Sequence, residues 1–202
     1  KHENITANFM EKVNSVEFLE NLKKISKTRK DYDFDEICFC TAHDVDKFFD
    51  LKGISKKRGQ VTLIKTNSTL SKLKFPICAG GYFSPNINEN HLAGSSYSNI
   101  DSSEILAEEH EEILEKMTEI HEGKMDVIGG RVGFRTVTKD RAPIAGHLND
   151  FYLNVGHGSR GSTSAPLCSQ YIADLIDNKP VPIDSEVEKM LSPERFIIKT
   201  SE

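Results

Sequence analysis

A glycine-rich hexapeptide late in the chain has the spacing of a phosphate-binding loop. Residues 156–161 read Gly-His-Gly-Ser-Arg-Gly and fit the pattern G-x-G-x-x-G, which holds the pyrophosphate of NAD or FAD when it joins a strand to a helix. Residues 151–155 read as a short buried strand, and residues 164–177 read as a helix with Pro166 in its first turn. Residues 179–184 carry two prolines two positions apart, which excludes the central parallel strand that a dinucleotide-binding unit requires next. The loop is therefore predicted to have a role other than binding the pyrophosphate of a dinucleotide in a strand–loop–helix–strand unit.

Two arginines form a second candidate site. In a strand covering residues 131–135, the period of two places Arg131, Gly133 and Arg135 on one face. A guanidinium group suits a planar carboxylate because it donates two parallel charge-assisted hydrogen bonds, and the glycine lets a ligand approach closely. The alternative is a pair of surface arginines that form ion pairs with Asp140 or a glutamate.

The elements that must position these residues are strands followed by one long helix. Compact apolar runs broken by glycine and proline predict an antiparallel sheet with strands at 34–42, 59–65, 75–84 and 91–97, and strand-like alternation also occurs at 10–22. A helix is predicted over 104–121, with Asp101 and Glu104 as a capping pair. Its many glutamates are interpreted as a solvated face.

Composition narrows the class of protein. With 202 residues, 37% apolar residues and a formal charge of −5, the chain has the composition of a globular protein, and no apolar run approaches the ~18 residues of a membrane helix. We expect a cytoplasmic location and, from the spacing of the cysteines and histidines, no metal site. Basic residues at 23–30 and 52–58 form either solvated surface or contacts to a phosphate backbone.

Four blocks of sequence carry a resemblance to a known family. They are residues 81–85 (GYFSP), 91–97 (HLAGSSY), 131–143 (RVGFRTVTKDRAP) and 155–166 (VGHGSRGSTSAP), and residues 191–196 (LSPERF) resemble the family's closing motif. In this order they resemble the C-terminal part of the FAD-dependent oxidoreductase domain of the bifunctional tRNA 5-methylaminomethyl-2-thiouridine biosynthesis proteins, within the glycine-oxidase and D-amino-acid-oxidase superfamily. The chain starts at Lys1 rather than at a methionine, which favours a fragment whose true fingerprint lies upstream.

The resemblance implies a cofactor and site residues. It implies FAD, with the late glycine loop beside the flavin ring, so the cofactor-binding residues are predicted to be Gly156, His157, Gly158, Ser159, Arg160, Gly161 and Ser162. By the same resemblance Arg135 binds the substrate carboxylate, Tyr82 faces the substrate and Arg131 has a supporting electrostatic role. No catalytic acid or base is assigned, because flavin carries the chemistry.

The resemblance also implies a fold and a function. The fold is α+β, an incomplete glycine-oxidase-like flavoprotein with an antiparallel-sheet substrate domain at 45–128 and remnants of the FAD-binding domain at 1–44 and 129–202. The implied activity removes the carboxymethyl group from carboxymethylaminomethyl-uridine at the tRNA wobble position, in a family whose proteins also carry a methyltransferase half. Two alternatives stay open: an oxidase of glycine or another small amine, and a non-catalytic module that docks tRNA or a partner enzyme.

Overall fold

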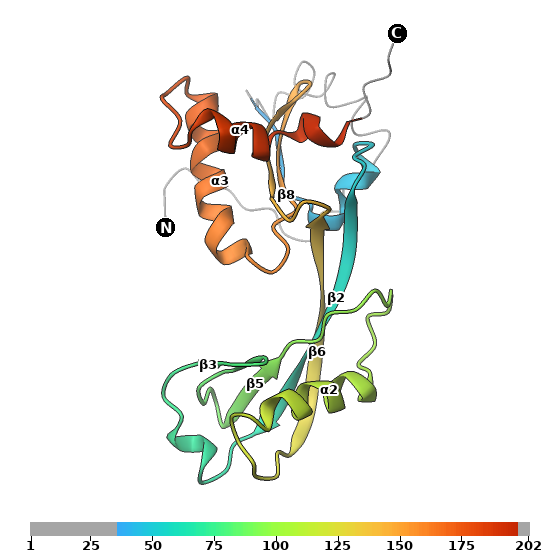
Figure 1. The fold of residues 1–202 in the computed structure, drawn as a ribbon, viewed down its shortest axis with the longest axis vertical. Coiled ribbons are helices and arrows are strands. Elements are labelled where there is room, and N and C mark those ends of the chain that lie inside the picture. The colour runs from blue at the N-terminus through green and yellow to red at the C-terminus, as the bar shows by residue number, and fades with distance from the viewer. Residues whose placement is uncertain (1–35, 198–202) are drawn as a thin grey trace, which may run out of the picture. The chain divides into compact units, whose positions relative to one another are not determined.

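The chain divides into two compact units in a computed structural model that describes residues 36–197 (Figure 1). Residues 54–142 and 156–161 form one unit, here called the sheet unit, and the other described residues form the second, here called the helical unit. The strand that crosses residue 128 pairs with a strand that begins at residue 54, so both belong to the sheet unit. The domain boundaries expected at 44/45 and 128/129 stay a prediction. The strand-like stretch at 10–22 lies outside the described residues.

The sheet unit is built on a five-stranded sheet. Its strands, in the order β3-β4-β5-β2-β6, are β3 (Ile77–Cys78), β4 (Tyr82–Phe83), β5 (Asn90–Gly94), β2 (Ile54–Lys65) and β6 (Val127–Thr138). Every pairing in this sheet is antiparallel, which confirms the prediction of an antiparallel sheet. The run expected as one strand at 75–84 is a hairpin, β3 and β4, whose turn is closed by a bond from Ala79 N to Gly81 O.

One face of this sheet is apolar and is covered by helix α2 (Ala107–Met117), as Figure 1 shows. The alternation of β2 sends Ile64 toward the helix, where it is fully buried with Phe83 of β4 and Ala93 of β5. Ile113 and Met117 complete this core from α2. The opposite face of β2 and β6 carries Gly59 and Gly133, which are direct partners in the register.

Helix α2 differs from its prediction at the first turn. It begins at Ala107, three residues later than expected, and no side chain of its own caps it. Gln60 of β2 takes that role, since its amide oxygen accepts from Leu106 N at 2.8 Å and its amide nitrogen donates to Leu106 O at 2.8 Å. Asp101 is held instead by Lys56, with Nζ to Oδ1 at 2.6 Å. A contact from strand β2 to the start of α2 has replaced the local cap that the sequence suggested.

The helical unit contains a small sheet and two helices. Its sheet has the order β1-β8-β7, with β1 (Cys38–Phe39) parallel to β8 (Phe151–Val155) and β7 (Ile144–Leu148) antiparallel to β8. A 3₁₀ helix η1 (Ala42–Lys47) follows β1, and α3 (Gly161–Ile176), α4 (Ser185–Leu191) and 3₁₀ helix η3 (Pro193–Phe196) follow β8. Tyr152, Cys168, Tyr171 and Leu191 are buried together in its core.

The strand and helix around the glycine loop are confirmed, with one correction. Helix α3 begins at Gly161, so Pro166 lies in its second turn rather than its first and removes one backbone hydrogen bond there. Residues 179–184 form no strand, as the two prolines required, and Asp184 caps α4 by accepting from Glu186 N and Val187 N. The loop is thus not part of a dinucleotide-binding unit in the described residues.

Three properties of residues 36–197 concern membranes, metals and thiols. No helix among them is long and apolar enough to cross a bilayer. Nowhere in this range do three potential ligands from His, Cys, Asp and Glu converge on a metal position. Of the four cysteines only Cys168 is buried, and the Sγ atoms of Cys38 and Cys40 lie 3.9 Å apart.

Candidate functional site

The open face of the sheet unit holds a pocket that brings together the residues predicted to bind a substrate. Tyr82, Arg131 and Arg135 line this pocket, which has a volume of about 230 Å³. Its floor is formed by Gly59, Val61 and Gly133, and the remaining lining residue is Phe134. Strands β2 and β6 supply the floor because their period of two places these residues on the face that α2 leaves uncovered. We call it the arginine pocket.

Arg135 lies flat across this floor and is held in place by three oxygens. Its Nη2 donates to Ser95 Oγ at 2.7 Å, and its Nη1 donates to the main-chain oxygens of Arg58 at 3.4 Å and Ser96 at 3.5 Å. A Cβ atom on Gly59 would lie 1.9 Å from Nη1, so the guanidinium fills the space that a side chain at residue 59 would take. The Nε of Arg135 has no partner among residues 36–197, which leaves a donor for a ligand.

Arg131 and Tyr82 are the other two residues of the pocket that were predicted to bind a substrate. Arg131 is exposed, and its side chain forms no hydrogen bond or ion pair with any residue in the described range 36–197. Tyr82 pairs with Gly94 in the register, and a Cβ on Gly94 would lie 3.0 Å from the Tyr82 hydroxyl, so this glycine makes room for the phenol. Neither arginine is paired with Asp140 or with another described carboxylate, which removes the alternative of a surface ion pair within this range.

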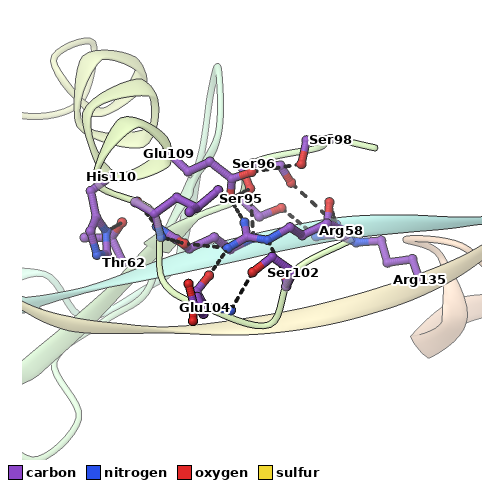
Figure 2. A network of polar contacts seen from close by, with 12 residues as sticks. Arg58, Thr62, Ser95, Ser96, Ser98, Ser102, Glu104, Glu109, His110 and Arg135 are labelled. Atoms are coloured by element: carbon purple, nitrogen blue, oxygen red, sulfur yellow. Dashed lines mark hydrogen bonds and ion pairs between the residues drawn. The ribbon is translucent and has the colours of Figure 1, made fainter. Parts of the chain in front are cut away.

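Behind the floor lies a buried polar network centred on Arg58 and Glu109, shown in Figure 2. Arg58 is fully buried, and its guanidinium forms an ion pair with Glu109 of α2 and donates to the main-chain oxygens of Ser102 and Glu104. Burial by itself would raise the pKa of Glu109, but hydrogen bonds from Ser96 and Ser98 together with the Arg58 charge hold it below the usual value. The expectation that the α2 glutamates form a solvated face is wrong for Glu109.

The burial of Arg58 also changes the interpretation of the basic residues at 52–58. Arg58 is not on the surface, and Lys56 forms an ion pair with Asp101. Lys57 keeps its charge and donates to the side-chain oxygen of Asn99. The burial of Arg58 and the ion pair of Lys56 reduce the positive potential that this segment presents to a phosphate backbone. The basic residues at 23–30 lie outside the described residues.

A second pocket, of about 210 Å³, is formed by the glycine loop and is here called the loop pocket. Gly156, His157, Gly158, Ser159 and Arg160 line it, opposite Tyr97, Val137 and Arg141. Two of the predicted cofactor residues are placed elsewhere: Gly161 and Ser162 form the first residues of α3 and do not line this pocket.

Backbone geometry explains why the loop needs its first two glycines. Gly156 and Gly158 have φ values of 76° and 56°, in the left-handed region that glycine adopts without steric cost. The loop is tied to β6 because Gly158 N donates to Thr136 O at 2.8 Å, and residue 157 bridges to residue 137. Burial lowers the pKa of His157, so the imidazole is favoured in its neutral form there.

Tyr97 connects the two pockets within the sheet unit. Its ring lines the loop pocket, and the Arg135 guanidinium carbon lies 5.8 Å from the ring centroid, within the range of a cation–π contact. Sequence reasoning missed Tyr97, Ser95 and the Arg58–Glu109 pair, which no local pattern marks. It also missed Gly59, although an isolated glycine inside a strand is a recognised sign of close approach by another group.

Comparison with known proteins places these features in a family. Residues 6–175 match the family model described as DAO, FAD dependent oxidoreductase. Among curated proteins, the chain is 28% identical over 182 residues to the tRNA 5-methylaminomethyl-2-thiouridine biosynthesis bifunctional protein MnmC of Campylobacter jejuni subsp. doylei, covering 75% of this chain and 29% of that protein. It is 30% identical over 210 residues to the protein of the same name from Shewanella amazonensis, covering 83% and 32%. The chain thus spans about a third of the length of these relatives.

Solved structures show the same fold. Glycine oxidase from Geobacillus kaustophilus superposes with a TM-score of 0.67 at 18% identity, over 81% of this chain and 46% of that one. Iminodiacetate oxidase from Chelativorans sp. BNC1 superposes with a TM-score of 0.66 at 20% identity, over 79% and 46%. The glycine-oxidase-like fold expected from the sequence is therefore confirmed. With the family model matching most of its length, this chain belongs to the DAO family of FAD-dependent oxidoreductases.

Proposed function

We propose that this chain is part of a flavoenzyme that removes the carboxymethyl group from carboxymethylaminomethyl-uridine at the wobble position of tRNA. The products would be aminomethyl-uridine and glyoxylate. The observation that carries the proposal is the arginine pocket, because Arg135, Arg131 and Tyr82 meet there over a floor of two glycines. An N-substituted glycine, the reacting part of this substrate, has the single carboxylate that such a pocket suits.

The described residues fit one part of FAD, its flavin end. The loop pocket offers a glycine-rich backbone, two arginines and the aromatic ring of Tyr97, a combination suited to a planar ring system that gains negative charge on reduction. Gly156, His157, Gly158, Ser159 and Arg160 would hold it. When bound, FAD supplies the two-electron oxidation of the carbon–nitrogen bond, and water hydrolyses the resulting substrate imine.

The protein's own contribution is to bind and orient the substrate. Arg135 would bind the carboxylate through its free Nε and remaining Nη2 donors, because its other donors are committed to Ser95, Ser96 and the main chain of Arg58. Arg131, four residues along the same strand, would add positive potential without a fixed geometry. Tyr82 would form the wall of the pocket across from Arg131 and Arg135. We assign no catalytic acid or base.

The choice of tRNA as substrate rests on the relatives rather than on the basic residues. The curated relatives are named for biosynthesis of 5-methylaminomethyl-2-thiouridine in tRNA. In the sheet unit, Arg58 is buried and Lys56 is paired with Asp101, so this segment supports a phosphate contact less than its composition suggested. The exposed Arg131 is the cation of this unit best placed to meet a nucleotide phosphate near the pocket.

The test compares three substrates in the full-length protein with FAD bound. An anticodon stem-loop carrying carboxymethylaminomethyl-uridine, N-methylglycine and glycine are each mixed with the enzyme, and glyoxylate release and flavin reduction are followed. We expect the stem-loop to react with the highest kcat/KM and to lose the mass of its carboxymethyl group. Preferential reaction with the small amines would instead establish an amine oxidase, and salt-dependent binding of the stem-loop without glyoxylate would establish a docking module.

A further inference from the structure

We propose that Glu109 of α2 is a positioning residue for Arg135, and that the buried Arg58–Glu109 pair sets the direction in which the substrate-binding guanidinium points. This inference rests on the proposed role of Arg135 as the carboxylate-binding residue. It assigns a function in ligand selection to a residue on the far face of the sheet, which makes no contact with the arginine pocket itself.

Glu109 braces two backbone segments that already pair with each other. Main-chain hydrogen bonds join Arg58 and Ser98 in both directions, and Ser96 N donates to Gln60 O. The Glu109 carboxylate accepts from Ser96 Oγ at 2.7 Å and from Ser98 Oγ at 2.9 Å, and it is paired with the Arg58 guanidinium. Ser96 also accepts from Gln60 N at 2.8 Å. One buried carboxylate therefore ties residues 95–98 to residues 58–60 of β2.

These two segments also supply the oxygens that hold Arg135. Its Nη1 donates to the main-chain oxygens of Arg58 and Ser96, two of the three residues whose side chains bond Glu109. Its Nη2 donates to Ser95 Oγ in the same segment. Figure 2 shows the polar contacts around Arg58, Glu109 and Arg135 as dashed lines. A change in the spacing of the two segments would therefore move the acceptors that orient the guanidinium.

The charge of Glu109 also matters to Arg135, because it balances the buried charge of Arg58. Arg58 is fully buried on one face of the sheet, and the Arg135 guanidinium lies on the other face, in the space over Gly59, the residue that follows Arg58 in β2. Ion pairing with Glu109 neutralises Arg58, so the positive charge presented to the pocket is that of Arg135 and Arg131. Removing the Glu109 charge would leave a buried cation that must draw other acceptors toward itself, including oxygens that now serve Arg135.

The experiment uses the full-length protein with FAD bound and methoxyacetate as probe, a carboxylate that resembles N-methylglycine but has no oxidisable amine. Binding is measured by isothermal titration calorimetry, so no turnover is needed. We expect Glu109→Gln to raise the Kd for methoxyacetate about 10-fold, in the range of couplings within one hydrogen-bonded network. Glu108→Gln is the matched control, because Glu108 is an exposed glutamate on the same turn of α2 and should leave the Kd unchanged.

A double-mutant cycle separates positioning from general destabilisation. In an Arg135→Met background, Glu109→Gln should have no further effect on methoxyacetate binding, although its effect on the melting temperature should persist. Ser98→Ala removes one of the bonds to Glu109 and gives a milder variant, with an expected Kd increase of about 3-fold, should Glu109→Gln fail to fold.

The outcomes distinguish this inference from the proposed function. If Arg135→Met binds methoxyacetate as wild type does, the carboxylate role of Arg135 is wrong. If Arg135→Met weakens binding while Glu109→Gln and Ser98→Ala leave the Kd unchanged, or act equally in the Arg135→Met background, the positioning role of Glu109 is overturned.

Discussion

The close contact between Gly59 and Arg135 allows a test that separates ligand binding from folding. A Cβ built on Gly59 would lie 1.9 Å from Nη1, 2.4 Å from Cζ and 2.4 Å from Nη2 of Arg135. Ordinary contact between such atoms begins at about 3.5 Å, so Gly59→Ala should displace the guanidinium by roughly 1.6 Å. The atoms that clash are the far end of a flexible side chain, so the backbone can stay where it is.

The expected loss of affinity for methoxyacetate follows from the contacts that the displacement breaks. A shift of this size ends the 2.7 Å bond from Nη2 to Ser95 Oγ and turns the guanidinium away from its ligand geometry. Losing one charge-assisted bond to a carboxylate costs about 1.5–3 kcal/mol, which raises the Kd for methoxyacetate roughly 10- to 150-fold. Stability should change by less, since alanine in a strand interior is favoured over glycine by about 0.5–1 kcal/mol and offsets part of the strain.

The assay pairs calorimetric titration with thermal unfolding of the full-length protein with FAD bound. Gly133→Ala is the comparison variant, because Gly133 is the register partner of Gly59 on the same face and a Cβ there would meet no protein atom within 4 Å. It leaves the Arg135 guanidinium in place, so its effect on binding comes only from contact with the ligand on the pocket floor. We expect Gly133→Ala to weaken binding far less than Gly59→Ala. Equal effects of the two changes, or a normal Kd in Gly59→Ala, would refute the argument that Gly59 exists to seat Arg135.

The remaining predictions concern the two arginines, the loop and the dependence on pH. Arg135→Met should lower kcat/KM for the modified stem-loop about 30-fold or more with FAD content unchanged, and Arg131→Met should do less; loss of FAD from Arg135→Met would instead place that residue in the cofactor site. Gly158→Val should lose FAD, measured by the visible absorbance of the purified protein, and also some stability because residue 158 has a φ of 56°. Asparagine tolerates this φ better, so Gly158→Asn should lose FAD with a smaller fall in melting temperature. Full flavin absorbance in both variants would contradict the assignment of the loop to the cofactor site. Burial lowers the pKa of His157 in the folded protein, so between pH 6.5 and the lower folded value the unfolded chain binds more protons than the folded one. The melting temperature should therefore fall on acidification through this range, and it should fall less steeply in His157→Gln. An unchanged slope in His157→Gln would contradict the role of His157 in this pH dependence.

Much of the fold could be read from the sequence, because the relevant patterns are local. The alternation around β2, β5 and β6 and the apolar stripe of α2 each specify an element and the face that it buries. The alternation at 131–135 also placed Arg131, Gly133 and Arg135 on one face, which the arginine pocket agrees with. The prediction of the first turn of α2 failed because a long-range contact replaces the local one: Gln60 of β2 bonds the main chain of Leu106, so Asp101 and Glu104 do not form the cap.

Only the tertiary structure decided which charged residues are buried and what they hold. Arg58 reads as one more member of a basic run and Glu109 as one more glutamate of a polar helix, yet they are separated by 51 residues and form a buried pair. Their pairing depends on the packing of α2 against β2, and packing partners far apart in sequence leave no periodic signal. The same holds for Gly59 and Arg135: the sequence supplied a glycine and an arginine with suitable chemistry, whereas the antiparallel register of β2 and β6 laid the guanidinium over the missing side chain.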